Sequence, residues 1–169
     1  MSAVQQFQRS LSELADTEST VTTPEEFPDV LEAAIEQPAV GAELPFDSVS
    51  LDGTDVTLDP SPDQLREAET GVSGSRLGIA SLGTVAVESR SAGDEFVSLY
   101  PETHVVAVRE SDLRTDLKSG FEWLDEEFED GNRSFILATG PSATGDMGAL
   151  VQGVHGPERV HVIIIQDNE

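Results

Sequence analysis

The residues best suited to binding chemistry form a short turn after an apolar run. Residues 139–146 read Thr-Gly-Pro-Ser-Ala-Thr-Gly-Asp and directly follow the apolar segment 134–138. Small residues at the carboxyl end of a buried strand let main-chain N–H groups approach an anion. The turn lacks the lysine and the spacing of a Walker loop, so it is not an ATP site. An ordinary structural turn would look the same. The alternative is a cradle for a small anionic metabolite, made by Gly140, Ser142, Thr144 and Asp146.

Three histidines, His104, His155 and His161, offer imidazole groups late in the chain. His155 lies in the bend 153–157 (Gly-Val-His-Gly-Pro), where glycine and proline fix an unusual backbone path that can present a side chain. Each imidazole could instead cap a strand end or bond a buried carbonyl. Because of this bend, we predict that His155 contacts the ligand. We expect no metal site, because the spacing of the three histidines does not show that their rings converge.

A second segment that is poor in acids is expected to share this surface. Residues 71–93 contain one acid, Glu88, and their small and branched residues predict a buried strand, or two strands broken at Gly83. Gly83 and Thr84 are therefore included among the predicted ligand-binding residues. Segment 134–165 holds only two acids, where an even spread would put about six. The scarcity of acids in both segments therefore indicates a constraint other than exposure to solvent.

The sequence gives no basis for assigning a catalytic residue. The serines next to glycine lie outside a Gly-x-Ser-x-Gly elbow. In a chain this acidic, pairs of carboxylates occur at any spacing and carry no information. The absence of cysteine excludes disulfides, thiol nucleophiles and cysteine-bound iron–sulfur clusters in this chain. No cofactor is predicted.

The excess of acidic residues indicates the salt concentration in which the protein works, and it does not identify a ligand. The 169 residues include 33 acids and nine bases, a net charge of −24, and Lys118 is the single lysine. The acids are spread along the whole chain, which is typical of a halophilic protein whose carboxylates are screened by salt. Nucleic acids and anionic membranes would be repelled. No apolar run approaches the roughly 20 residues that span a bilayer, and Met1–Ser10 lacks the features of a signal peptide. We expect a cytoplasmic protein without membrane insertion.

The elements that would position these residues indicate one α/β domain over residues 1–169. Apolar residues at three- and four-residue steps predict a helical region over 1–37 and a helix over 112–128. β-Branched runs predict strands at 104–108, 134–138 and 160–165. A peripheral hairpin or loop is expected between residues 38 and 60. The pattern predicts a mostly parallel central sheet covered by helices on both faces.

The same motifs resemble those of the LUD-domain family, which includes lactate-utilisation protein C. The resemblance covers a motif-bearing core at 71–165, and its motifs are Gly-Val-Ser-Gly at 71–74, Ile-Ala-Ser-Leu-Gly-Thr at 79–84, Ser-Leu-Tyr-Pro at 98–101, and the segments 140–146 and 153–157. It implies a NagB/RpiA/CoA-transferase-like fold, a three-layer α/β/α sandwich. It also implies a role in oxidising L-lactate to pyruvate with iron–sulfur partner subunits, which fits a chain without cysteine.

Two family carboxylates are replaced here, by Ser81 and Gly148. The resemblance therefore favours a non-redox accessory subunit of 2-hydroxy acid metabolism. A regulatory module that binds a small metabolite is one alternative. A stand-alone isomerase or acyl-CoA transferase, with Glu88 as nucleophile, is another.

Overall fold

Two parallel strands that are buried on both faces form the centre of the molecule. The computed structural model describes residues 1–132, 134–144, 151–152 and 156–167. Strands β7 (Thr103–Arg109) and β12 (Arg159–Ile165) pair in parallel, with Val162 opposite Val106. Their continuous β-branched sequences suit strands that face packed layers on both sides. The strands predicted at 104–108 and 160–165 are confirmed.

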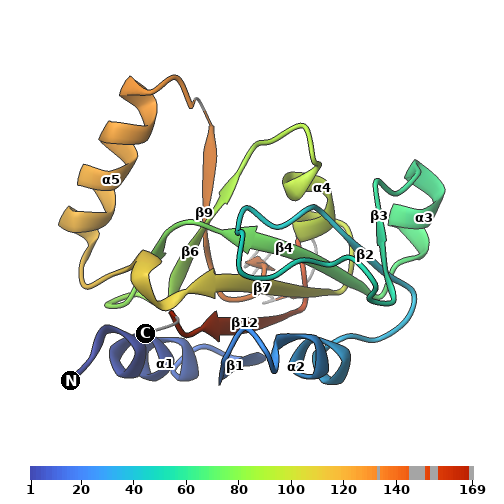
Figure 1. Ribbon diagram of the computed structural model, residues 1–169, viewed down its shortest axis with the longest axis horizontal. Coiled ribbons are helices and arrows are strands. Elements are labelled where there is room, and N and C mark those ends of the chain that lie inside the picture. Colours follow the sequence, from blue (N-terminus) through green and yellow to red (C-terminus); the bar gives the residue numbers. More distant parts are fainter. Residues whose placement is uncertain (133, 145–150, 153–155, 168–169) are drawn as a thin grey trace.

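The central sheet has six strands, and every neighbouring pair in it is parallel. The order is β1-β12-β7-β4-β2-β3. Figure 1 shows β4, β7 and β12 side by side in the middle of the molecule. The four remaining strands are β1 (Thr17–Thr22), β2 (Ala39–Gly41), β3 (Val56–Leu58) and β4 (Thr70–Ser75). The predicted α/β fold with a mostly parallel central sheet is confirmed.

Two amphipathic helices cover opposite faces of this sheet. Helix α2 (Phe27–Ala34) packs Phe27 and Leu31 on the face that carries Val105, Ala107 and Ile163. Helix α1 (Ala3–Ser12) packs Phe7 and Leu11 on the other face, against Val106, Val108 and Val162. Alternate residues of β7 thus enter different cores, as the period of a strand requires. A Ser2–Gln5 capping box begins α1.

A second, four-stranded sheet lies on the same side as α1. Its order is β8-β5-β6-β9, formed by β8 (Leu113–Arg114), β5 (Gly78–Ile79), β6 (Thr84–Glu88) and β9 (Phe135–Thr139). Helix α5 (Leu117–Glu129) packs on it through Leu124, which lies in a cluster with Leu77, Ile79 and Ala86. In Figure 1, α5 stands beside this sheet and β9 runs across the direction of the central strands.

Short elements complete the chain. They are α3 (Pro62–Glu67), α4 (Asp94–Leu99), a 3-10 turn η1 (Glu110–Asp112), β10 (Ala143–Thr144) and β11 (Val151–Gln152). Helix α4 packs very closely on β4, because a Cβ atom at Gly71 would lie 1.6 Å from the carbonyl oxygen of Val97. Within the described residues, no helix has both the length and the apolar character to cross a bilayer.

Several details of the sequence prediction were wrong. Region 1–37 is not wholly helical, because β1 lies between its helices and forms the edge of the central sheet beside β12. The strand predicted at 134–138 belongs to the second sheet. Residues 38–60 contain β2 and β3, which pair in parallel rather than as a hairpin. The predicted helix 112–128 begins only after the Asp116 cap, because Leu113–Arg114 pairs with β5.

Candidate functional site

A cavity of about 270 Å³ lies between the central sheet and the second sheet. Strands β6 and β9 supply one wall, β7 and β12 supply another, and Ser98 and Leu99 of α4 close one side. Residues 139–142 and 156–157 complete the lining. The apolar part of the lining is formed mainly by Val85, Val87, Ile136, Val160 and Val162. The volume suits a small metabolite and lies just below the usual range for drug-sized ligands.

The described residues that line this cavity carry no charged side chain. Seventeen described residues line it, and none is Asp, Glu, Lys or Arg. An even spread of the 33 acids would put about three among them. The acid-poor composition of the two predicted segments therefore coincides with a real cavity. The polar groups of these described residues are hydroxyls, main-chain atoms and the imidazole of His104.

The cavity brings together three of the seven predicted ligand-binding residues. Gly83, Gly140 and Ser142 line it. Thr84 lies beside it, with its hydroxyl oxygen 2.6 Å from that of the lining residue Thr139. Thr144 belongs to β10, and nothing is described of its side chain. Asp146 and His155, together with Gly148, lie outside the described residues.

The predicted anion cradle of main-chain amides is not available at Ser142. Its N–H donates to the carbonyl oxygen of Pro157 at 2.8 Å, so the residue can offer a ligand only its hydroxyl. Gly83 and Gly140 both have a φ of +66°, which favours glycine. Both are also closely packed: a Cβ at Gly83 would lie 2.8 Å from the Leu11 nitrogen in α1, and one at Gly140 would lie 3.0 Å from Leu14 Cδ1, just after α1. Packing alone is therefore sufficient reason for these two glycines.

The position of the cavity also differs from the expected one. It follows the carboxyl end of β9, as predicted, but it lies near the amino ends of β7 and β12. The main-chain hydrogen bond from Glu158 N–H to Glu102 O, 2.7 Å long, joins the residues that precede those two strands. The usual ligand position of a parallel sheet is at the carboxyl ends. The difference arises because β9 belongs to the second sheet.

Among the described residues, the imidazole that lines this cavity is that of His104, which was not among the predicted ligand-binding residues. His104 is almost completely buried in β7, and its Nε2 lies 2.7 Å from the Oγ of Ser73 on β4. Burial lowers the pKa of His104 to about 4, so the ring is neutral at neutral pH. The sequence feature that could have identified His104 is a single histidine within a run of β-branched residues that predicts a buried strand. Its pairing with Ser73 depends on the register of β4 and β7.

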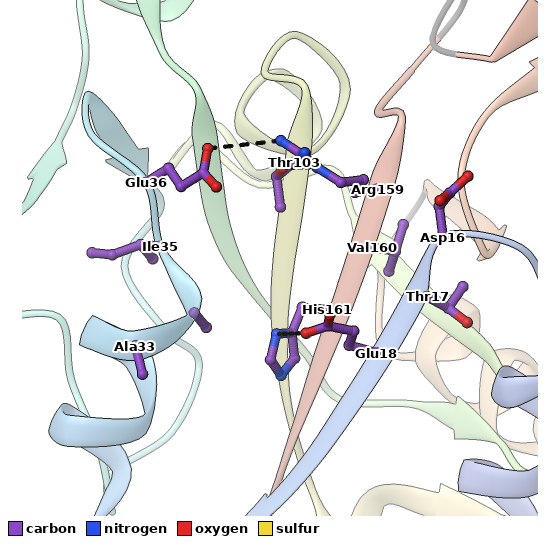
Figure 2. Close-up of a pocket in the computed structure, with 11 residues that line it drawn as sticks. Asp16, Thr17, Glu18, Ala33, Ile35, Glu36, Thr103, Arg159, Val160 and His161 are labelled. Carbon is purple, nitrogen blue, oxygen red and sulfur yellow. Dashed lines mark hydrogen bonds and ion pairs between the residues drawn. The ribbon is translucent and has the colours of Figure 1, made fainter.

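A second cavity, of about 310 Å³, contains His161 and is shown in Figure 2. His161 Nε2 lies 2.9 Å from the hydroxyl of Thr20, and Nδ1 lies 3.5 Å from a Glu18 carboxylate oxygen. Burial lowers the pKa of His161, while Glu18 acts in the opposite direction. Asp16 and Glu36 add acids to the lining, and Glu36 pairs with Arg159. These contacts are consistent with a structural role for His161.

The described residues contain no group of three or more His, Asp or Glu side chains that could hold a metal ion. Glu88, the candidate nucleophile of a CoA transferase, points away from the 270 Å³ cavity. Its neighbour Val87 lines the cavity, and successive side chains of a strand face opposite sides. The Glu88 carboxylate instead pairs with Arg76 at 3.0 Å. This pairing removes the geometric support for catalysis by Glu88.

The fold and the cavity together define an α/β protein with a cavity between two sheets. The LUD domain model matches residues 10–165, and the chain belongs to this family. A crystal structure of a DUF162 family protein from Deinococcus radiodurans superposes with a TM-score of 0.70 at 22% identity, covering 96% of each chain. At that level of identity the likeness supports the fold alone.

Curated relatives carry the name lactate utilization protein C. The protein of that name from Deinococcus radiodurans is 32% identical over 118 residues, which cover 67% of this chain and 55% of the relative. The one from Geobacillus thermodenitrificans is 28% identical over 109 residues, covering 62% of this chain and 45% of the relative. The chain thus matches about half the length of these relatives.

Proposed function

We propose that this protein binds a small 2-hydroxy or 2-oxo carboxylate in the 270 Å³ cavity, as a non-redox accessory subunit of L-lactate utilisation. The observation that carries the proposal is that the described lining residues are uncharged and lie next to the neutral imidazole of His104. A carboxylate side chain there would repel an organic acid, and none of the described lining residues is acidic. The names of the relatives supply the metabolic setting.

The composition supports the division of labour in this proposal. A chain without cysteine holds no cysteine-bound cluster, so electrons from lactate would pass to iron–sulfur partner proteins inside the cell. This chain would bind the acid and hold it while partner subunits carry out the redox chemistry. A regulatory module that senses the same acids is the second candidate, favoured by the absence of a catalytic carboxylate in the described lining.

Thermal unfolding in multi-molar KCl tests the binding step. A ligand present at 100 times its Kd stabilises the folded state by about 2.7 kcal/mol, which raises the Tm by roughly 5–10 °C for a chain of this size. L-Lactate or pyruvate should produce such a rise, whereas acetyl-CoA should not.

Two histidine variants make a matched pair for this test. His104→Phe should abolish the rise, and His161→Phe, in the other cavity, should keep it. No shift with either acid would refute the proposal. Reconstitution with the iron–sulfur partners then separates the two candidates, because an accessory subunit is required for lactate oxidation and a sensor is not.

A further inference from the structure

The hydrogen bond between the buried side chains of Ser73 and His104 determines whether the His104 ring can donate or accept a hydrogen bond in the cavity. Ser73 is completely buried, and among the described residues its hydroxyl contacts only Nε2 of His104. If Nε2 carried the ring proton, the Ser73 proton would lack an acceptor. A buried hydroxyl proton without an acceptor is costly, and the pair satisfies the Ser73 proton only when Ser73 is the donor. This favours the arrangement in which the Ser73 O–H donates to Nε2.

The neutral ring then carries its proton on Nδ1. Imidazole has one donor and one acceptor nitrogen when it is neutral, and the partner of one nitrogen fixes the other. Since Nε2 accepts from Ser73, Nδ1–H is the polar group that the ring can present to the cavity. Ser98, Leu99 and Val162, all uncharged, line the same cavity as the ring.

We infer that His104 donates from Nδ1–H to an acceptor oxygen at carbon 2 of a bound monocarboxylate, and that Ser73 is the positioning residue that fixes this tautomer. The inference rests on the proposed function and narrows its ligand class. A buried carboxylate without a charged partner is costly, so the ligand's single carboxylate belongs near the mouth, where water reaches it. A second carboxylate or a phosphate would have to enter the uncharged interior. The site should therefore select pyruvate or L-lactate over malate and sugar phosphates.

The tautomer can be measured without any ligand. The chain has three histidines, so long-range ¹H–¹⁵N NMR spectra in multi-molar KCl can be assigned with His104→Phe and His161→Phe. We expect the His104 signals of the Nδ1–H form in the wild-type protein. In Ser73→Ala they should shift toward the Nε2–H form. The matched control is Ser75→Ala, because Ser75 is buried on the same strand and donates to the carbonyl oxygens of Leu77 and Ala86.

Titration with pyruvate, L-lactate and malate supplies the second readout. Ser73→Ala should weaken pyruvate binding roughly 2- to 10-fold, the usual effect of one hydrogen bond. Ser75→Ala should leave the affinity unchanged, and malate should not compete with pyruvate.

The two proposals fail in different ways. An Nε2–H tautomer in the wild-type protein, or a His104 signal that does not change in Ser73→Ala, overturns the positioning role. Pyruvate binding that is equally tight in His104→Phe overturns the contact and the assignment of the ligand to this cavity, while binding of the acid by the chain itself stands. No binding by any monocarboxylate, with the tautomer as expected, overturns the proposed function and the ligand class together.

Discussion

Replacing Arg76 with methionine removes the charge at the centre of a cluster that joins three parts of the fold. Arg76 Nη2 lies 3.0 Å from Glu88 Oε2 on β6 and 2.6 Å from Glu127 Oε2 on α5. Its guanidinium carbon also lies 5.2 Å from the ring centre of Trp123. The side chains of Arg76, Glu88 and Glu127 are 27%, 17% and 14% exposed. The cluster is therefore largely shielded from solvent.

The cost of the substitution comes mainly from the two carboxylates that remain. Methionine keeps much of the aliphatic stem, so packing changes little. Glu88 and Glu127 are left partly desolvated, close together and without a counter-charge. Breaking a buried ion pair costs about 3–5 kcal/mol, and residual solvent access places this cluster near 3 kcal/mol. That is a large part of the 5–15 kcal/mol typical of a folded domain.

The pH dependence gives an independent check on this reasoning. The hydrogen bond from Arg76 is the largest cause that lowers the pKa of Glu127 in the folded protein below its ordinary value of 4.5. A carboxylate with a lowered folded pKa stabilises the protein above its unfolded pKa, and this stabilisation is lost as the pH falls through the folded value. The difference in unfolding free energy between wild type and Arg76→Met should therefore be full at neutral pH and shrink below pH 4.5.

Urea denaturation in multi-molar KCl measures both effects. Arg66→Met is the matched control, because Arg66 and its partner Asp63 are mostly exposed, and it should change the unfolding free energy by less than about 0.5 kcal/mol. Adding Glu88→Gln and Glu127→Gln to Arg76→Met should restore part of the lost stability. The reasoning is refuted if Arg76→Met unfolds like wild type at neutral pH, or if its deficit persists unchanged in acid.

Three further outcomes follow from packing and charge. Leu124→Ala should cost about 2–5 kcal/mol in urea denaturation, because Leu124 is 5% exposed, whereas Phe121→Ala, at 52% exposed, should cost within about 0.5 kcal/mol. Gly83→Ala should lower the unfolding free energy by about 1–3 kcal/mol, since it combines a positive φ with a close approach to Leu11; the same change at the open position Gly53 should cost less. Transfer from multi-molar to about 0.1 M KCl should lower the Tm, because the Debye length grows to about 10 Å and the net charge of −24 is screened less; an unchanged Tm would contradict a halophilic protein.

The core of the fold could be predicted from the sequence because its strands are buried on both sides. Runs such as 104–108 and 160–165 have no polar face, and only a layered α/β arrangement covers such strands. Strand β1 was missed for the opposite reason. Thr17–Thr22 is polar, only its last residue is buried, and it lies at the sheet edge. An edge strand of this kind carries no apolar period.

The inward face of α5 could not be derived from spacing. The apolar stripe predicted over 112–128 consists of Leu113, Leu117, Phe121, Leu124 and Phe128, but of its members within α5 only Leu124 is buried. The helix instead turns Gly120 toward the sheet, where a Cβ would lie 2.8 Å from Ile79 Cδ1. Helical periodicity identifies an apolar stripe, but the width of the sheet beneath determines how much of the stripe is covered. The second sheet is only partly covered by this helix.

The details of the candidate site likewise could not be derived from the sequence alone. Composition pointed to segments that share one cavity, since Gly83, Gly140 and Ser142 line it. Composition could not show that the Ser142 amide is already bonded, or that Ser73 and His104, 31 residues apart, lie within hydrogen-bonding distance. Both facts depend on which strands are neighbours and in which register. The sequence specifies these only through long-range packing.

The acidic surface and the uncharged cavity are best understood together. An organic acid must approach a chain that carries a net charge of −24, and at low salt that field would oppose its entry. In molar salt the Debye length falls to about 3 Å, so distant carboxylates no longer act on the ligand. What remains is the local environment of the cavity, and there a single additional carboxylate would act at close range with little screening. The lack of acids among the described lining residues is therefore the feature that would let such a surface coexist with the proposed site for a small anion.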